Sequence, residues 1–137
     1  MDKVELDAIT ERIIGAAHKV SNTLGAGFVE KVYENAHAYE MRKDGLFVVQ
    51  QHPIKVVYDG IVVGDFYVNM LVENLVLVEL KSVSALNDDH MMQTLDYLRA
   101  ANLPACLLIN FGTPKAQIRR LHPSPTWKTH TWKYAKR

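Results

Sequence analysis

The stretch Leu75-Val76-Leu77-Val78-Glu79-Leu80-Lys81-Ser82-Val83 places an acid and a base inside an otherwise apolar run. The apolar residues are continuous and rich in valine, which is typical of a buried strand. Glu79 and Lys81 are two residues apart, so on a strand they point to the same face. Burying two charges costs several kcal/mol per ion unless each finds a partner. The pair is therefore either a satisfied internal salt bridge or part of a reaction centre.

The residues before this run predict two further strands. Asp59-Gly60 is a strong signal for a two-residue hairpin turn, and Glu73-Asn74 predicts a second tight turn that leads into the run. Pro53 marks a bend or a sheet edge. The three strands form an antiparallel meander whose last member is the most buried. The predicted segments are 46–51 continuing into 54–58, then 61–72, then 75–83.

Helical spacing of apolar residues recurs in three segments. The first helix contains residues 10–19 and should end between Asn22 and Gly27, and the second spans residues 29–43. We expect His37 at the surface of the second helix. The third helix begins at Asn87, whose acidic successors suit a first turn. The predicted inner face of the second helix consists of Val32, Tyr33, Ala36 and Tyr39 or Glu40.

Two short strands complete the prediction, a buried one at residues 105–110 and an edge strand at 116–121. The element order is therefore α-α-β-β-β-α-β-β. This order predicts an α/β fold in which helices pack against a mixed sheet.

Composition sets broad limits on the class of protein. The chain has 137 residues, 48% of them apolar and 23% charged, which suits one globular domain and argues against disorder. The lone cysteine, Cys106, lies in an apolar run, which predicts a buried thiol in a reducing compartment. No apolar stretch approaches the roughly 20 residues that a membrane span requires. We therefore expect a cytoplasmic protein without membrane contact.

A basic, aromatic tail follows the predicted domain, which occupies residues 1–122. Residues 123–137 carry four cations interleaved with aromatic side chains, a composition that suits phosphate contacts and base stacking. The alternative is a solvated tail whose tryptophans pack on the domain. The four candidate nucleic-acid contacts are Lys128, Lys133, Lys136 and Arg137.

Four motifs in order give the chain a family resemblance. Gly27-Phe28-Val29-Glu30-Lys31-Val32-Tyr33 is a Gly-x-x-Glu-x-x-Tyr sequence, and Glu79-Leu80-Lys81 is Glu-x-Lys. Gln93 and Tyr97 follow, and then the segment 107–112. Together they resemble the GxxExxY proteins, a branch of the PD-(D/E)XK nuclease superfamily. The resemblance covers roughly residues 8–121 and implies an α-β-β-β-α-β core.

The resemblance also implies a reaction and a set of residues. It implies metal-dependent hydrolysis of phosphodiesters in DNA or RNA with Mg²⁺ or Mn²⁺, hard cations that prefer oxygen ligands. Glu30, Asn69 and Glu79 would be the metal ligands, and Lys81 would orient the attacking water and stabilise negative charge.

Gln93 and Tyr97 would support this site. They are four residues apart, so they share one face of the third helix. The resemblance implies that they lie beside the metal centre and position the nucleic acid or the motif residues. The alternative is that Tyr97 belongs to the core and Gln93 faces solvent.

Asn69 departs from the family pattern, which has an acid about ten residues before the Glu-x-Lys glutamate. An asparagine oxygen can bind Mg²⁺, but it brings no negative charge and should weaken metal binding. Asp65 lies on the same strand face, yet four strand residues span about 13 Å. We therefore expect a weakened nuclease or, alternatively, a non-catalytic domain that binds nucleic acid. A third interpretation is an assembly protein that forms a homo-oligomer through its edge strand and aromatic tail.

Overall fold

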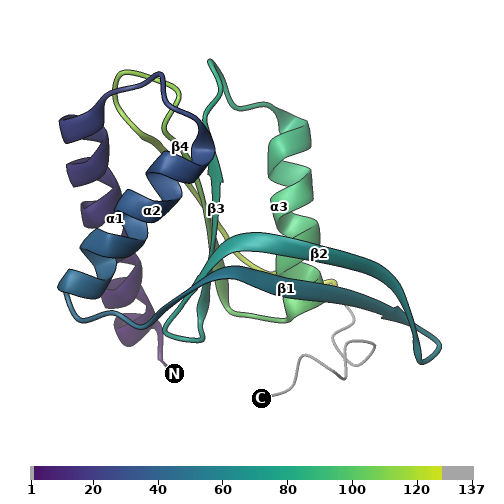
Figure 1. The fold of residues 1–137 in the computed structure, drawn as a ribbon. Helices are drawn as coiled ribbons and strands as arrows, with labels where there is room; N and C mark the ends of the chain where they lie inside the picture. The colour runs from purple at the N-terminus through teal and green to yellow at the C-terminus, as the bar shows by residue number, and fades with distance from the viewer. Residues whose placement is uncertain (1, 128–137) are drawn as a thin grey trace.

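The computed structural model describes residues 2–127, which form a five-stranded sheet between two layers of helices (Figure 1). Helices α1 (Lys3–Leu24) and α2 (Glu30–Lys43) cover one face of the sheet, and α3 (Asp88–Ala101) covers the other. The predicted order α-α-β-β-β-α-β-β is confirmed. The strands are β1 (Val48–Tyr58), β2 (Ile61–Val72), β3 (Val76–Lys81), β4 (Ala105–Asn110) and β5 (Gln117–Leu121).

The strands lie side by side in sequence order, from β1 at one edge to β5 at the other. β3 and β4 are parallel, and α3 makes the crossover between them, whereas the other neighbours are antiparallel. Both predicted tight turns are present, since Asp59, Glu73 and Asn74 adopt the left-handed backbone that two-residue hairpin turns require. The mixed α/β sheet predicted from the sequence is therefore observed.

Side-chain caps fix where α1 and α3 begin. The Asp2 carboxylate accepts a hydrogen bond from the Glu5 amide at 2.8 Å. Asn87 and His90 form a reciprocal capping box at the start of α3, as the predicted start at Asn87 requires. α3 ends at Asn102, whose left-handed backbone terminates the helix.

The prediction for the inner face of α2 was wrong by about one residue. The buried residues are Tyr33, Glu34, His37, Ala38 and Met41, which recur at helical spacing. The four residues other than Tyr33 that were predicted to face inward are all partly or largely exposed, and His37 is fully buried instead. The error arose because the polar Glu34 and His37 were not assigned to a core-facing position.

β1 is one continuous strand that includes Pro53, the residue predicted to mark a bend or a sheet edge. Pro53 pairs with Tyr67 of β2, and β1 is the outermost strand, a position that tolerates proline. The edge interpretation is therefore the correct one. No helix among residues 2–127 has the length and apolar content to cross a bilayer.

The two faces of β3 enter two different core clusters. Val76, Val78 and Leu80 pack with α1 and α2, whereas Leu77 packs with α3 and the buried Cys106. Because side chains alternate along a strand, Glu79 and Lys81 share the face of Leu77. The acid and the base therefore point toward the α3 side of the sheet, at the end of β3.

Candidate active site at the strand fork

β2 and β3 part at the position where the sequence carries Asn69 and Glu79. Their ladder runs from the pair Val72–Val76 to the pair Met70–Val78, and the next pair outward would join Asn69 to Glu79. From there β2 follows β1 in a long hairpin that leaves β3 and passes α3 (Figure 1). We call the point of separation, formed by Asn69, Glu79 and Leu80, the strand fork.

The Asn69 side chain replaces the ladder hydrogen bonds that are lost at the strand fork. Its Oδ1 accepts a hydrogen bond from the Leu80 amide at 2.8 Å, and its Nδ2 donates to Oε1 of Glu34 at 2.9 Å. The Asn69 amide lies 3.4 Å from Oε1 of Glu79, to which it donates a long hydrogen bond. Asn69 therefore lies between two carboxylates, one from α2 and one from β3.

Glu34 is the acid that sequence reasoning missed. Its side chain is 1% exposed and accepts hydrogen bonds from four side chains. These donors are Gln50 and Gln51 at 2.7 Å, Asn69 at 2.9 Å and Lys31 at 3.0 Å. Burial favours the neutral acid, but the hydrogen bonds from Asn69, Gln50 and Lys31 outweigh it and lower the pKa of Glu34. The Glu34 carboxylate is therefore an ionised, fully partnered group.

Glu79 has the opposite environment. The residue is 6% exposed, and burial raises the pKa of its carboxyl group to about 7. The Asn69 amide and the Lys81 charge lower that pKa, while repulsion from Glu30 and Glu34 raises it. Near pH 7 this carboxyl group is about half ionised, which suits a group that accepts and releases a proton.

Lys81 lies beside Glu79 but does not neutralise it in an ion pair. Among the ion pairs of residues 2–127, none joins these two side chains within 4.0 Å. Lys81 is partly exposed, and its charge still acts on Glu79. The interpretation of Glu79 and Lys81 as a closed internal salt bridge is therefore not supported.

The other predicted site residues are distributed around the strand fork. Glu30 lies in the first turn of α2, near enough to Glu79 to raise its pKa. Gln93 and Tyr97, on α3, line a groove on the same side of the sheet. Asp65 lies farther along β2, where it pairs with Lys55 at 3.5 Å. Lys128, Lys133, Lys136 and Arg137 lie outside the described residues.

The predicted metal ligands do not form an oxygen cage around a shared point. Oδ1 of Asn69 already accepts a hydrogen bond from the Leu80 amide. Nδ2 of Asn69 directs its N–H groups toward Glu34, whereas a cation bound there would need oxygen lone pairs. Among residues 2–127, no cluster of three or more His, Cys, Asp or Glu side chains is placed to hold a metal ion. The side chains present at the strand fork therefore do not fit a bound Mg²⁺ or Mn²⁺.

The Gly-x-x-Glu-x-x-Tyr motif has a structural role in the segment between α1 and α2. The Tyr33 hydroxyl donates a hydrogen bond to the Gly25 carbonyl and accepts one from the Phe28 amide at 3.2 Å. The Tyr33 ring stacks on Phe111 with centroids 4.7 Å apart. Tyr33 thus fixes the loop that leads into α2 and positions Glu30 and Glu34 above the sheet.

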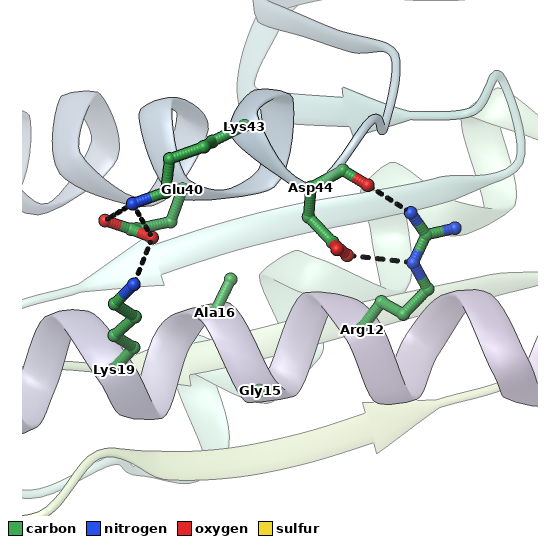
Figure 2. A pocket seen from close by; sticks show the side chains of 7 residues that line it. All are labelled: Arg12, Gly15, Ala16, Lys19, Glu40, Lys43 and Asp44. Carbon is green, nitrogen blue, oxygen red and sulfur yellow. Dashed lines mark hydrogen bonds and ion pairs between the residues drawn. The ribbon is translucent and has the colours of Figure 1, made fainter.

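A second pocket, between α1 and α2, is a weaker candidate site (Figure 2). Its charged side chains neutralise one another, because Arg12 pairs with Asp44, and Lys19 and Lys43 both pair with Glu40. These contacts are exposed salt bridges of the kind that joins two helices, and each contributes little to stability.

Comparison with known proteins agrees with this architecture. The sequence profile of the PD-(D/E)XK nuclease superfamily matches residues 7–121. The crystal structure of an alkaline exonuclease from Laribacter hongkongensis is similar with a TM-score of 0.53 and 11% sequence identity. That similarity covers 77% of this chain and 61% of the exonuclease, so this chain corresponds to about three fifths of the exonuclease. No curated protein matches the sequence.

The fold and the profile match define the class of protein. The profile match covers residues 7–121 of the 137, and the mixed sheet with helices on both faces is consistent with it. The chain belongs to the PD-(D/E)XK nuclease superfamily.

Proposed function

We propose that this chain is a phosphodiesterase domain that acts on nucleic acid at the strand fork, with a hydrolytic step that Asn69 keeps slow. The observation that carries the proposal is the buried Glu79, with a pKa of about 7, beside the partly exposed Lys81 on one strand face. The Gly27–Tyr33 motif supports a finer assignment to the GxxExxY branch of the superfamily.

Each of the two side chains supplies a distinct part of the chemistry. The Lys81 ammonium group attracts a phosphate and stabilises the negative charge that develops during hydrolysis. The Glu79 carboxylate can accept a proton from an attacking water, because its pKa lies near neutral pH. Hydrolysis adds that water across the P–O bond, so one product carries the phosphate and the other carries a hydroxyl group.

Asn69 limits this chemistry because it is neutral and its N–H groups face Glu34. Nucleases of this superfamily typically use divalent metals, which bind more tightly as the number of carboxylates increases. An aspartate at position 69 would replace the N–H groups with oxygen lone pairs beside Glu34 and Glu79. We therefore expect Asn69→Asp to gain metal affinity and hydrolytic activity together.

The test measures cleavage of end-labelled single- and double-stranded DNA and RNA with Mg²⁺ or Mn²⁺. It compares the natural chain, Asn69→Asp, and the double variant Asn69→Asp/Lys81→Ala, all purified in the same way. We expect Asn69→Asp to cleave at least about tenfold faster than the natural chain, and the double variant to lose that gain. Calorimetry should show tighter metal binding by Asn69→Asp.

Two results would contradict the proposal. Equal cleavage by Asn69→Asp and the double variant would identify a contaminating nuclease. Metal binding and cleavage that do not change between the natural chain and Asn69→Asp would show that position 69 does not limit the site.

A second candidate function is non-catalytic binding of nucleic acid. The observation that favours it is the hydrogen bonding of Asn69, which satisfies Glu34 and the Leu80 amide without a cation. This candidate predicts salt-sensitive binding that survives Glu79→Ala and weakens when the four basic residues of the tail are removed. Binding by the natural chain, combined with an inert Asn69→Asp variant, would favour this candidate over hydrolysis.

A further inference from the structure

A groove of about 580 Å³ runs between the β1–β2 hairpin and α3. Phe66 and Val63 of β2 form one wall, and Met92 and Tyr97 of α3 form the other. Phe66 is 42% exposed and Met92 57% exposed, so the groove presents apolar surface to solvent. A concave site of this size, lined by apolar and aromatic side chains with a few polar groups, is a candidate ligand site.

The groove leads to the candidate active site. Gln93 and Tyr97 belong to its lining, and the Phe66 ring lies 5.6 Å from the Tyr97 ring, centroid to centroid. Burial and then repulsion from Glu79 raise the pKa of the Tyr97 hydroxyl, which places that hydroxyl within electrostatic reach of the strand fork. The groove therefore lies on the side of the sheet toward which Glu79 and Lys81 point.

The charges of the groove favour a nucleobase over the phosphate backbone of a nucleic acid. Asp89, Asp96 and Arg99 line the groove, so its charged side chains are two carboxylates and one guanidinium, and the net negative charge repels a phosphate backbone. A nucleobase is uncharged, has two flat apolar faces, and carries N–H groups that can donate to a carboxylate. The groove is therefore complementary to a base, while the backbone is attracted to Lys81.

We propose that this groove binds an unpaired nucleobase next to the phosphate at the strand fork, with Phe66 as the stacking surface. The inference rests on the proposed function and adds a substrate class to it. A base inside a duplex has both faces covered by its neighbours, so only a single strand or an opened end can fill the groove. The preferred substrate is therefore single-stranded nucleic acid.

Gly64 allows the Phe66 ring to take this position. A Cβ atom at residue 64 would lie 2.8 Å from the ring, so any side chain there would force the ring to move. Gly64→Ala is therefore a variant that displaces the stacking surface without removing it.

The test measures binding by fluorescence anisotropy in the presence of a chelator, so that hydrolysis does not interfere. The probes are a short single-stranded DNA, a duplex of the same length, and a fully abasic single strand with the same number of phosphates. The variants are Phe66→Ala and a matched control, Tyr67→Ala. Tyr67 is the next residue on β2 and is 59% exposed, but strand alternation points it to the other face.

We expect Phe66→Ala to weaken single-strand binding about tenfold, because the base loses the aromatic ring on which it stacks. Tyr67→Ala should change binding by less than about twofold. The natural chain should bind the single strand more tightly than the duplex or the abasic strand, and Phe66→Ala should lose the preference over the abasic strand. Met92→Ala, on the opposite wall, should show the same pattern with a smaller loss, which guards against misfolding of Phe66→Ala.

Three results would overturn the inference. The first is an equal loss of single-strand affinity in Phe66→Ala and Tyr67→Ala. The second is equal affinity of the natural chain for normal and abasic strands. The third is self-association of the natural chain that Phe66→Ala abolishes, which would assign the groove to a second copy of the chain. Failure of the proposed function is distinguishable, because it is read from cleavage by Asn69→Asp. An inert Asn69→Asp with intact Phe66-dependent binding would leave the base site in place and remove hydrolysis.

Discussion

Glu34 and Glu79 are buried acids on either side of Asn69, and their surroundings shift the two pKa values in opposite directions. Glu34 receives four N–H donors, and those from Asn69, Gln50 and Lys31 lower its pKa. Glu79 receives one long backbone hydrogen bond and has a pKa of about 7. Both side chains have little contact with solvent, but burial weighs more on Glu79, which is also repelled by Glu30 and Glu34, so the pKa difference reflects deeper burial and repulsion as well as fewer donors. Burial alone raises a carboxyl pKa, and hydrogen bonds to the carboxylate reverse that effect.

The comparison separates a structural acid from a reactive one. Glu34 joins α2 to β1 and β2 and has no spare capacity for chemistry. Glu79 has few hydrogen-bond partners, which costs stability, and buried acids with perturbed pKa values of this kind cluster at functional sites. Substitutions at three residues test this division, in order of decreasing expected effect.

Glu34→Ala should be strongly destabilising. It removes the acceptor of Asn69, Gln51 and Lys31, while Gln50 keeps its bond to Asn35, and each partly buried donor left unsatisfied costs about 1–3 kcal/mol. Urea denaturation would measure the loss in the free energy of unfolding. The matched control is Glu40→Ala, since Glu40 pairs with Lys19 and Lys43 near the surface of the same helix (Figure 2). A loss no larger than that of the control would refute a structural role for Glu34.

Glu79→Gln should change the pH dependence of stability. The folded-state pKa of about 7 exceeds the ordinary value of 4.5, so the folded protein holds a proton that the unfolded chain has released between these values. That contribution is fully present below pH 4.5 and is lost as pH rises through 7, a change of about 3 kcal/mol. The variant should therefore gain stability relative to the natural chain from pH 4.5 to 7.5.

His37 gives the natural chain a compensating trend. Burial lowers the pKa of His37 from 6.5 to about 4, so acid favours the unfolded chain between these values and stability rises with pH there. Over pH 4.5–6.5 the two groups oppose each other, and the natural chain should show a shallow profile. Urea titrations at several pH values should show a clear rise in Glu79→Gln. Parallel profiles for the two proteins would mean that Glu79 titrates as an ordinary acid.

The fold was more predictable from the sequence than the site. Hydrophobic runs and turn residues are local signals, and the observed bounds of β2 and β4 match the predicted segments 61–72 and 105–110. The predicted start of α3 at Asn87 is also confirmed by its capping box. These features depend on neighbours within a few residues, which a sequence displays directly.

The environment of Glu34 depends on residues far away in the chain. Its partners Gln50, Gln51 and Asn69 come from two strands, and no local pattern connects them to α2. One signal was available, because Glu34 lies three and four residues before the buried His37 and Ala38 and so shares their helix face. The Gly-x-x-Glu-x-x-Tyr motif names Glu30 and not Glu34, so it carries no signal for the buried acid of α2.

Gln51 offers the smallest and most specific test of the comparison. Its backbone has a left-handed φ of 53°, unfavourable for a residue with a side chain, while its Nε2 donates to Glu34 at 2.7 Å. Gln51→Gly relieves the backbone but removes the hydrogen bond, and the net loss should be about 1 kcal/mol. Gln51→Asn tolerates the left-handed backbone with a side chain too short to keep the contact, so it should behave similarly. If the glycine variant were instead more stable than the natural chain, backbone strain at residue 51 would outweigh the hydrogen bond to Glu34.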